Sequence, residues 1–181
     1  QDVHFSQFAY APLAYNPALT GVFDGKARFT NAYRSQWSGL TKAYTTTHIS
    51  FDCPVAKASL KNQYFGWGLM INQDKAGDLG YKNTAIQTSL SYTISIDADA
   101  DNFMTVGFQA GLNQQSFDPT KATWDVQWNG DKFDPTIPSG ESFQLQQFSY
   151  ADISSGVLFH YVPDGYNAFY VGGSLSHIGS P

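Results

Sequence analysis

Two long stretches of alternating residues, 84–96 and 103–115, constrain the fold of this chain more than any other feature. In the first stretch, every second side chain from Ile86 to Ile96 is apolar, aromatic or threonine, and serine, threonine or glutamine fills the positions between. The second stretch repeats the pattern, with one face running from Met104 to Leu112. Alternation with a period of two places successive side chains on opposite faces of a β-sheet. Each stretch is longer than ten residues and uncharged, whereas strands of soluble proteins are most often about five or six residues long.

The polar faces of these stretches consist of serine, threonine, glutamine, asparagine and glycine rather than lysine and glutamate. Such a face suits a wet interior better than the surface of a soluble sheet. A strand that crosses a bilayer at a tilt needs about 9–11 residues. The two stretches therefore predict a hairpin in the wall of an antiparallel transmembrane β-barrel of the outer-membrane type.

Composition agrees with a membrane barrel and argues against other classes. Hydrophobic residues make up 42% of the chain, and no apolar run approaches the roughly 18 residues of a spanning helix. Aromatic residues (16%) outnumber charged ones (14%), as in barrels whose aromatic side chains form girdles at both membrane interfaces. The net charge of -5 argues against a nucleic-acid partner. The single cysteine, Cys53, excludes an internal disulfide and is expected to be a small buried thiol.

Five further stretches show similar alternation and bring the predicted strands to about seven: 26–36, 44–53, 64–73, 151–161 and 167–177. The second of the seven is expected to end at a turn that contains Pro54. The charged residues inside these strands all fall on the face opposite the apolar one: Lys26, Arg28, Arg34, Asp52 and Asp152. A charge that faces lipid at mid-bilayer costs about 2–4 kcal/mol, so a barrel requires this distribution.

Loop lengths predict the orientation of the barrel. The turns 97–102 and 162–166 are short, whereas the connection 116–150 is long. Because outer-membrane barrels have short periplasmic turns and long extracellular loops, we expect 37–43, 74–83 and 116–150 outside and the N-terminus in the periplasm. An open sheet of seven strands would leave two edges in lipid, so we expect this chain to be about the N-terminal half of a longer barrel.

Residues 1–25 are predicted to form an irregular aromatic segment. Pro12 and Pro17 interrupt any continuous helix or central strand, yet several side chains here need burial: Phe5, Phe8, Tyr10, Leu13, Tyr15 and Leu19. We expect the segment to lie in the mouth or lumen of the barrel whose strands occupy 26–181. The inward glycines of the G-W-G sequence at 66–68 are expected to make room inside for such a segment.

The inward polar side chains predict a network in the lumen, with these candidate members: Arg28, Arg34, His48, Asp152 and His160. Asp152 is a plausible partner for the two arginines, and His48 and His160 can in principle meet across the lumen. No His-x-x-x-His or Cys-x-x-Cys spacing is present, so a structural network is favoured over a metal site. The alternative is a recognition patch for a peptide that is threaded through the barrel or caps it.

The long connection carries several aromatic side chains, which often anchor protein interfaces: Phe117, Trp124, Trp128, Phe133, Phe143 and Phe148. Two arrangements remain open: the aromatic residues form an exposed contact surface, or they pack on one another in a loop that plugs the barrel mouth. A second loop, containing Lys75 and Asp78, lies on the same predicted side. The candidate partner-binding residues are therefore Trp124, Trp128, Phe133, Lys75 and Asp78.

No sequence motif for catalysis or cofactor binding is present, and we expect neither an enzyme nor a cofactor. The D-A-D-A-D run at 97–101 alternates acids as a calcium loop does. It lacks the glycine and the glutamate that such a loop carries at its sixth and twelfth positions. We expect a solvated hairpin turn there rather than a metal site.

Four motifs are shared with a known family. The opening D-V-H-F-S-Q-F-A-Y-A-P-L-A-Y-N-P-A-L-T-G is followed by Y-R-S-Q-W at 33–37, by N-Q-D-K-A-G-D-L-G at 72–80 and by the final S-H-I-G-S-P at 176–181. Across essentially its whole length the chain resembles the PorP/SprF family of type IX secretion membrane proteins of Bacteroidota. It has one glutamine inserted in the family's Asn-Asp-Lys-Ala-Gly-Asp motif. Gly179 and Ser180 depart from a family His-Leu-Thr-Gln-Pro element that normally lies mid-chain.

The resemblance implies an outer-membrane barrel with about twice as many strands. It also implies partners: outer-membrane lipid, other type IX components including periplasmic lipoproteins, and a large secreted surface protein, often a gliding adhesin. Family members help export that protein, or hold it at the cell surface, through its C-terminal domain. The residues alone leave two other functions open. One is a transport barrel for a small ligand, plugged by the N-terminal segment; the other is a soluble β-sandwich that binds carbohydrate through Trp124 and Trp128.

Overall fold

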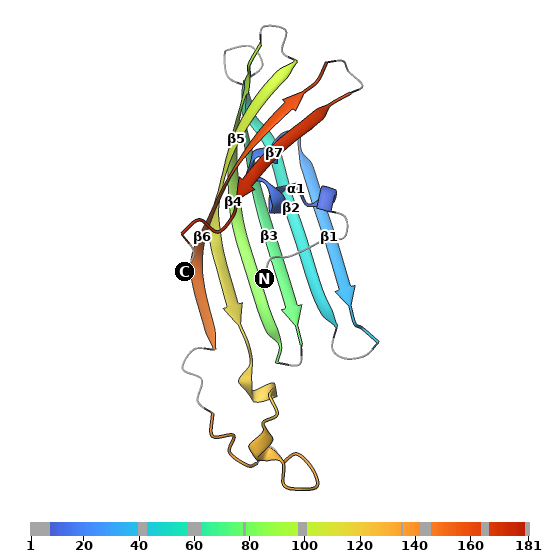
Figure 1. The fold of residues 1–181 in the computed structure, drawn as a ribbon, viewed down its shortest axis with the longest axis vertical. Coiled ribbons are helices and arrows are strands. Elements are labelled where there is room, and N and C mark those ends of the chain that lie inside the picture. The colour runs from blue at the N-terminus through green and yellow to red at the C-terminus, as the bar shows by residue number, and fades with distance from the viewer. Residues whose placement is uncertain are drawn as a thin grey trace.

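The fold is one antiparallel sheet of seven strands, ordered β1 to β7 along the chain and curled into a half-barrel (Figure 1). The computed structural model describes residues 8–39, 43–57, 63–77, 79–97, 101–134, 136–141, 146–163 and 167–179. The strands are β1 (Arg28–Gln36), β2 (Tyr44–Lys57), β3 (Tyr64–Ala76), β4 (Tyr81–Ser95), β5 (Asn102–Ser116), β6 (Gln147–Tyr161) and β7 (Phe169–Leu175). The predicted all-β antiparallel barrel class is confirmed. The β-sandwich alternative is wrong, because a sandwich needs two packed sheets and the described strands form one.

Strand β2 does not end at Pro54, as the sequence predicted, but continues to Lys57. Its pairing with β3 shifts register between Pro54 and Ala56. Such a bulge accommodates a proline, which has no backbone N–H to donate to the neighbouring strand. Cys53, directly before it, is a free thiol that is half-buried rather than buried as expected.

Several other strand boundaries differ from the prediction. Strand β3 extends to Ala76 and β4 begins at Tyr81, so the loop expected at 74–83 is a short turn. Strand β1 begins at Arg28, which places Lys26 before the sheet rather than inside it. Period-two alternation therefore located the strands, but polar residues near their ends obscured where they stop.

The two faces of the sheet differ in chemistry. The outer face leaves apolar side chains exposed along the strands, among them Phe51, Phe65, Leu69, Ile71, Ile86, Leu90, Phe108, Leu112, Ile153 and Val157. The inner face buries polar ones, including His48, Ser50, Asp52, Ser89, Thr93, Thr105 and Asp152. An apolar exterior around a polar interior is the pattern of a membrane barrel wall.

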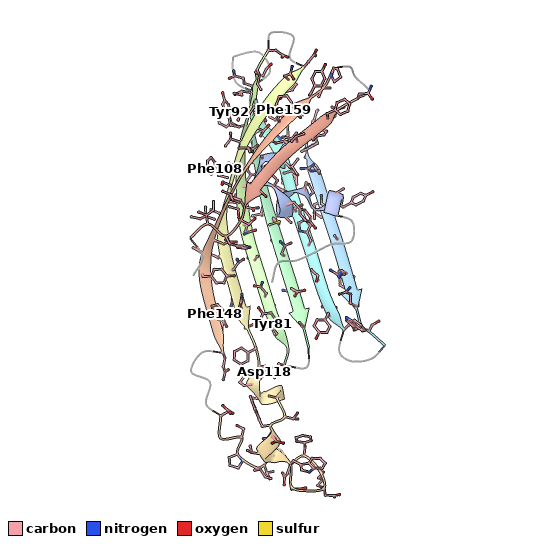
Figure 2. The ribbon with its side chains drawn as sticks, in the orientation of Figure 1. Tyr81, Tyr92, Phe108, Asp118, Phe148 and Phe159 are labelled. Carbon is pink, nitrogen blue, oxygen red and sulfur yellow. The ribbon has the colours of Figure 1, made fainter. Side chains whose placement is uncertain are left out.

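Aromatic side chains mark both ends of the sheet (Figure 2). Tyr81 and Phe148 lie toward the end that carries the long connection, whereas Tyr92 and Phe159 lie toward the opposite end. Phe108, between the two levels, points away from the sheet and is 60% exposed. Aromatic residues at both interfaces and apolar ones between them are typical of outer-membrane strands. None of the described helices is long and apolar enough to cross a membrane.

Residues 8–22 pack against the inner face of the sheet (blue in Figure 1). They form three short helical turns: η1 (Phe8–Tyr10), α1 (Pro12–Tyr15) and η2 (Pro17–Leu19). Ala18 and Val22 cluster with Leu158 of β6, and Leu13 is fully buried. This small apolar contact removes the aliphatic side chains of the segment from water.

Inward glycines allow the close approach of this segment. A Cβ atom at Gly107 would collide with the backbone of Pro17 and Ala18, and one at Gly66 would collide with the carbonyl group of Thr20. Strands rarely carry glycine unless another backbone comes close or the strand bends. The G-W-G sequence therefore marks a real contact with the N-terminal segment.

The connection between β5 and β6 extends beyond the strand ends (yellow to orange in Figure 1). It contains two single helical turns, η3 (Pro119–Lys121) and η4 (Asp125–Gln127). It leads away from the sheet rather than across its inner face.

Candidate functional site

Arg28 and Asp52 form a clamp that ties the N-terminal segment to β1 and β2. They lie directly opposite each other in the strand register, and the guanidinium donates from Nε and Nη2 to the two carboxylate oxygens at 2.9 and 2.7 Å. Arg28 Nη2 also donates to the Leu19 carbonyl at 3.0 Å, and Asp52 Oδ2 accepts from the Gly21 N–H at 2.7 Å. The suggestion that Asp152 pairs with Arg28 is wrong, because Asp52 occupies the position opposite.

Asp152 instead organises a separate cluster on the inner face of β4, β5 and β6. Its Oδ2 accepts hydrogen bonds from Gln87 Nε2 at 2.9 Å and Asn113 Nδ2 at 3.1 Å. Its Oδ1 lies 2.9 Å from Nδ1 of His177. Sequence reasoning missed His177, because it was assigned to the last strand; that strand ends earlier, and a positive φ of 57° turns His177 back toward Asp152.

The two candidate lumen histidines have different partners. His48 is fully buried on β2, and its Nδ1 lies 2.6 Å from Oδ1 of Asn72 on β3. His160, on β6, stacks against Phe103 at 4.7 Å and Tyr170 at 5.7 Å between ring centroids. Each histidine is thus built into its own side of the wall. Within the described residues, no group of three or more His, Cys, Asp or Glu side chains could hold a metal ion.

The acidic turn after β4 uses one carboxylate to close the hairpin. Asp97 Oδ1 accepts from the backbone N–H of Asp101 at 3.1 Å, and its Oδ2 accepts from Asn102 Nδ2 at 2.5 Å. The residues between, 98–100, lie outside the described part of the chain. Hydrogen bonds from the turn itself thus occupy both oxygens of Asp97, in agreement with a hairpin turn there.

The remaining candidates lie at the end of the sheet that carries the long connection. Arg34 is half-buried on the inner face of β1, and Lys75 is exposed near the end of β3. Asp78 is outside the described residues. Leu79 touches the long connection, since the Asp118 N–H donates to the Leu79 carbonyl at 3.0 Å.

The long connection is held by its own hydrogen bonds. Gln127 Oε1 accepts from the Trp124 N–H at 3.1 Å, and Gln127 Nε2 donates to the Ile137 carbonyl at 3.0 Å. The Asp134 carboxylate accepts from the N–H and hydroxyl of Thr136 at 2.9 and 2.6 Å. These two hydrogen bonds hold the pKa of Asp134 below its usual range, because they stabilise the charged form.

The aromatic residues of this connection are partly packed and partly exposed. Trp128 and Phe133 meet edge to face with ring centroids 5.2 Å apart, yet they remain 49% and 48% exposed. Trp124 and Phe133 line a groove of about 620 Å³ together with Ile137 and Pro138. The side chains thus pack on one another and still present a surface, and their role in binding a partner stays a prediction. The three aromatic candidates lie together, whereas Lys75 lies back on the sheet.

Comparison with known proteins identifies one family. The family described as type IX secretion system membrane protein PorP/SprF matches residues 1–180. No curated protein sequence and no solved structure matches the chain.

Proposed function

Because the chain belongs to the PorP/SprF family of type IX secretion system membrane proteins, we propose that it anchors, or helps export, a large secreted cell-surface protein. The barrel would sit in the outer membrane and bind that protein through its C-terminal domain. The observation that carries this proposal is the aromatic surface on the connection between β5 and β6, which extends beyond the wall (Figure 1).

An ordered loop binds a partner more tightly than a flexible loop with the same contacts, because less side-chain and backbone conformational entropy is lost on binding. The hydrogen bonds around Gln127 and Asp134 fix this loop before any partner arrives. Trp128 and Phe133, each about half exposed, then offer the kind of side chains that most often dominate interface energetics. The groove beside them gives a partner's apolar side chain a place to enter.

The proposed orientation places this loop and the neighbouring turn between β3 and β4 outside the cell, and the turns at the opposite end of the sheet in the periplasm. The turn after β4 is closed by Asp97 and the long connection lies at the opposite end of the sheet. The partner would then approach from the loop end, and other secretion components, including periplasmic lipoproteins, from the short-turn end.

A transport barrel for a small ligand is the second candidate. The observation that favours it is the packing of residues 8–22 against the inner face through polar contacts, such as Ser91 Oγ to the Thr20 carbonyl at 2.6 Å. A segment held largely by hydrogen bonds can act as a removable plug. Solute uptake by the intact protein would support this function.

The docking proposal is tested by affinity purification of the protein from detergent-solubilised outer membranes, followed by mass spectrometry. A double variant, Trp128→Ala with Phe133→Ala, should lower recovery of the surface protein at least about tenfold, the effect of losing interface hot spots. The matched control is Phe169→Ala, which removes an exposed, stacked ring at the other end of the sheet. Recovery equal to the native protein's in the double variant would refute docking through this loop.

A further inference from the structure

A small polar cavity lies on the inner face, between the N-terminal segment and the end of the sheet that carries the long connection. Its volume is about 110 Å³, room for several water molecules. Its wall comes from β3, β4, β5 and β6, from Ala14 of the segment and from His177 after β7. Asn83, Gln115 and Tyr150, toward the loop end of their strands, are only half-buried, so the cavity is reachable from that side.

Asp152 supplies a negative charge to this cavity and is 2% exposed. Its hydrogen-bond donors are two amides and one imidazole. Among the described residues, no lysine or arginine pairs with it, whereas the equally buried Asp52 has Arg28. His177 balances the charge of the carboxylate only when its imidazole is protonated. Burying an unpaired carboxylate costs free energy, and a bound cation would offset that cost.

Several side-chain amides of the cavity donate to groups of the chain, and two amides keep an acceptor without a partner. Amide nitrogens that donate to groups of the chain belong to Asn72, Gln87, Gln109, Asn113 and Gln115. The buried Oδ1 atoms of Asn83 and Asn113 have no hydrogen-bond partner. The orientation of Asn113 is settled by chemistry, since its nitrogen must face the carboxylate and its oxygen then faces away.

The unused acceptors and the charge of Asp152 together favour a cationic ligand that donates hydrogen bonds. A carboxylate offers about four acceptor positions, of which the three hydrogen bonds to Asp152 use all but one. That remaining position and the two free amide oxygens are all acceptors. A sugar hydroxyl would bring no charge to the Asp152 carboxylate, and an anion would be repelled by it. Arginine and lysine side chains carry donors and no acceptor, and the guanidinium of arginine presents five donors in a plane.

We propose that this cavity binds a guanidinium group, the group of an arginine side chain presented by a polypeptide on the loop side of the barrel. Only the source of that arginine rests on the proposed docking function; the binding of the cation does not. The site would give the docked polypeptide a charged anchor inside the wall, in addition to the aromatic surface on the loop.

The test uses the purified protein in a neutral detergent at pH 8 and low salt, titrated calorimetrically with N-acetyl-arginine amide. The matched probe is N-acetyl-citrulline amide, which has nearly the same shape but no charge. We expect saturable binding of the arginine probe and binding of the citrulline probe at least about tenfold weaker, because a charge pair that excludes water is lost. Equal binding of the two probes, or no saturable binding of either, would overturn the proposal.

Variants locate the site. Asp152→Asn should lower the affinity for the arginine probe at least about tenfold. Asp131→Asn, which replaces an exposed carboxylate in the long connection, should leave that affinity unchanged. Because Asp152→Asn also disturbs a buried cluster, Asn83→Ala is a second variant. It removes one free acceptor and leaves the hydrogen bonds from Gln87, Asn113 and His177 to Asp152 in place. Unchanged affinity in both cavity variants would place the cation elsewhere and refute the site. Arginine binding without any recovered surface protein would keep this site and refute only the docking proposal.

Discussion

Replacing Asp52 with asparagine should release residues 8–22 from the inner face while the sheet stays folded. Asp52 is fully buried and accepts from the Arg28 guanidinium and the Gly21 N–H. An asparagine keeps the size of the side chain but removes its charge and turns an amide N–H₂ toward groups that also donate. The arginine that holds the Leu19 carbonyl then loses its own support.

The size of the effect follows from the bonds between the clamp and the segment. Arg28 and Asp52 both belong to the sheet, so the segment itself loses the hydrogen bond from the Gly21 N–H to the charged carboxylate and the support of the bond from Arg28 to the Leu19 carbonyl. A hydrogen bond to a charged group contributes about 1.5–3 kcal/mol. At about 1.4 kcal/mol for each factor of ten, the population with an undocked segment should rise roughly tenfold to a hundredfold.

Hydrogen exchange followed by mass spectrometry in detergent measures this population directly. Peptides that cover 8–22 should exchange faster in Asp52→Asn, while peptides from β3 to β6 keep their protection. Asp152→Asn is the control, since it neutralises a carboxylate equally buried on the same face but bonded to Gln87 and Asn113. If the two variants expose the segment to the same extent, or if segment and sheet lose protection together, the clamp does not act as argued.

Two other substitutions probe the segment and the loop. Gly107→Ala should cost about 1–3 kcal/mol of segment docking by overpacking, seen as faster exchange of 8–22, because its Cβ meets the backbone of Pro17. Gly173→Ala, where nothing lies within 4 Å of the added atom, should change nothing. The pKa of Asp134 is lowered in the folded loop. Its contribution to the stability of the folded loop is therefore present above the usual aspartate pKa and is lost as the pH falls through the lowered value. Acidification through that range should therefore change the tryptophan fluorescence of the loop, and Asp134→Asn should flatten this response; an identical pH profile in the variant would contradict it.

The strand pattern was readable because a membrane wall imposes one rule on every strand. A lipid-facing charge is costly, so Arg28, Asp52 and Asp152 had to share the inner face, and their positions in the alternation showed it. The pairing among them was not readable. The pairing depends on the register between strands, which sets Arg28 opposite Asp52. That register follows from loop lengths and strand ends, and these are hard to locate where proline and polar residues interrupt the alternation.

The role of His177 was hidden for a different reason. Its contact with Asp152 needs a backbone turn with positive φ after β7. A glycine in the sequence would predict such a turn, whereas a histidine does not. Glycine positions were the more useful signal. Gly66 and Gly107 both fall on inward positions, and both lie where the N-terminal segment touches the sheet.

The inner face is divided along its length, and this division separates the two proposed functions. The segment contacts Gly107 and Gly156, nearer the short turns, whereas Asp152 and Asn113 lie nearer the long connection. A polypeptide that docks from the loop side therefore meets the cavity and the aromatic surface without displacing the segment, but a solute that crosses the barrel must displace it. Asp52→Asn should then leave recovery of the surface protein unchanged if the protein is an anchor, and should raise solute flux if it is a plugged transporter. Loss of the surface protein in this variant would mean that the segment itself takes part in docking, and the division of the face into two independent halves would be wrong.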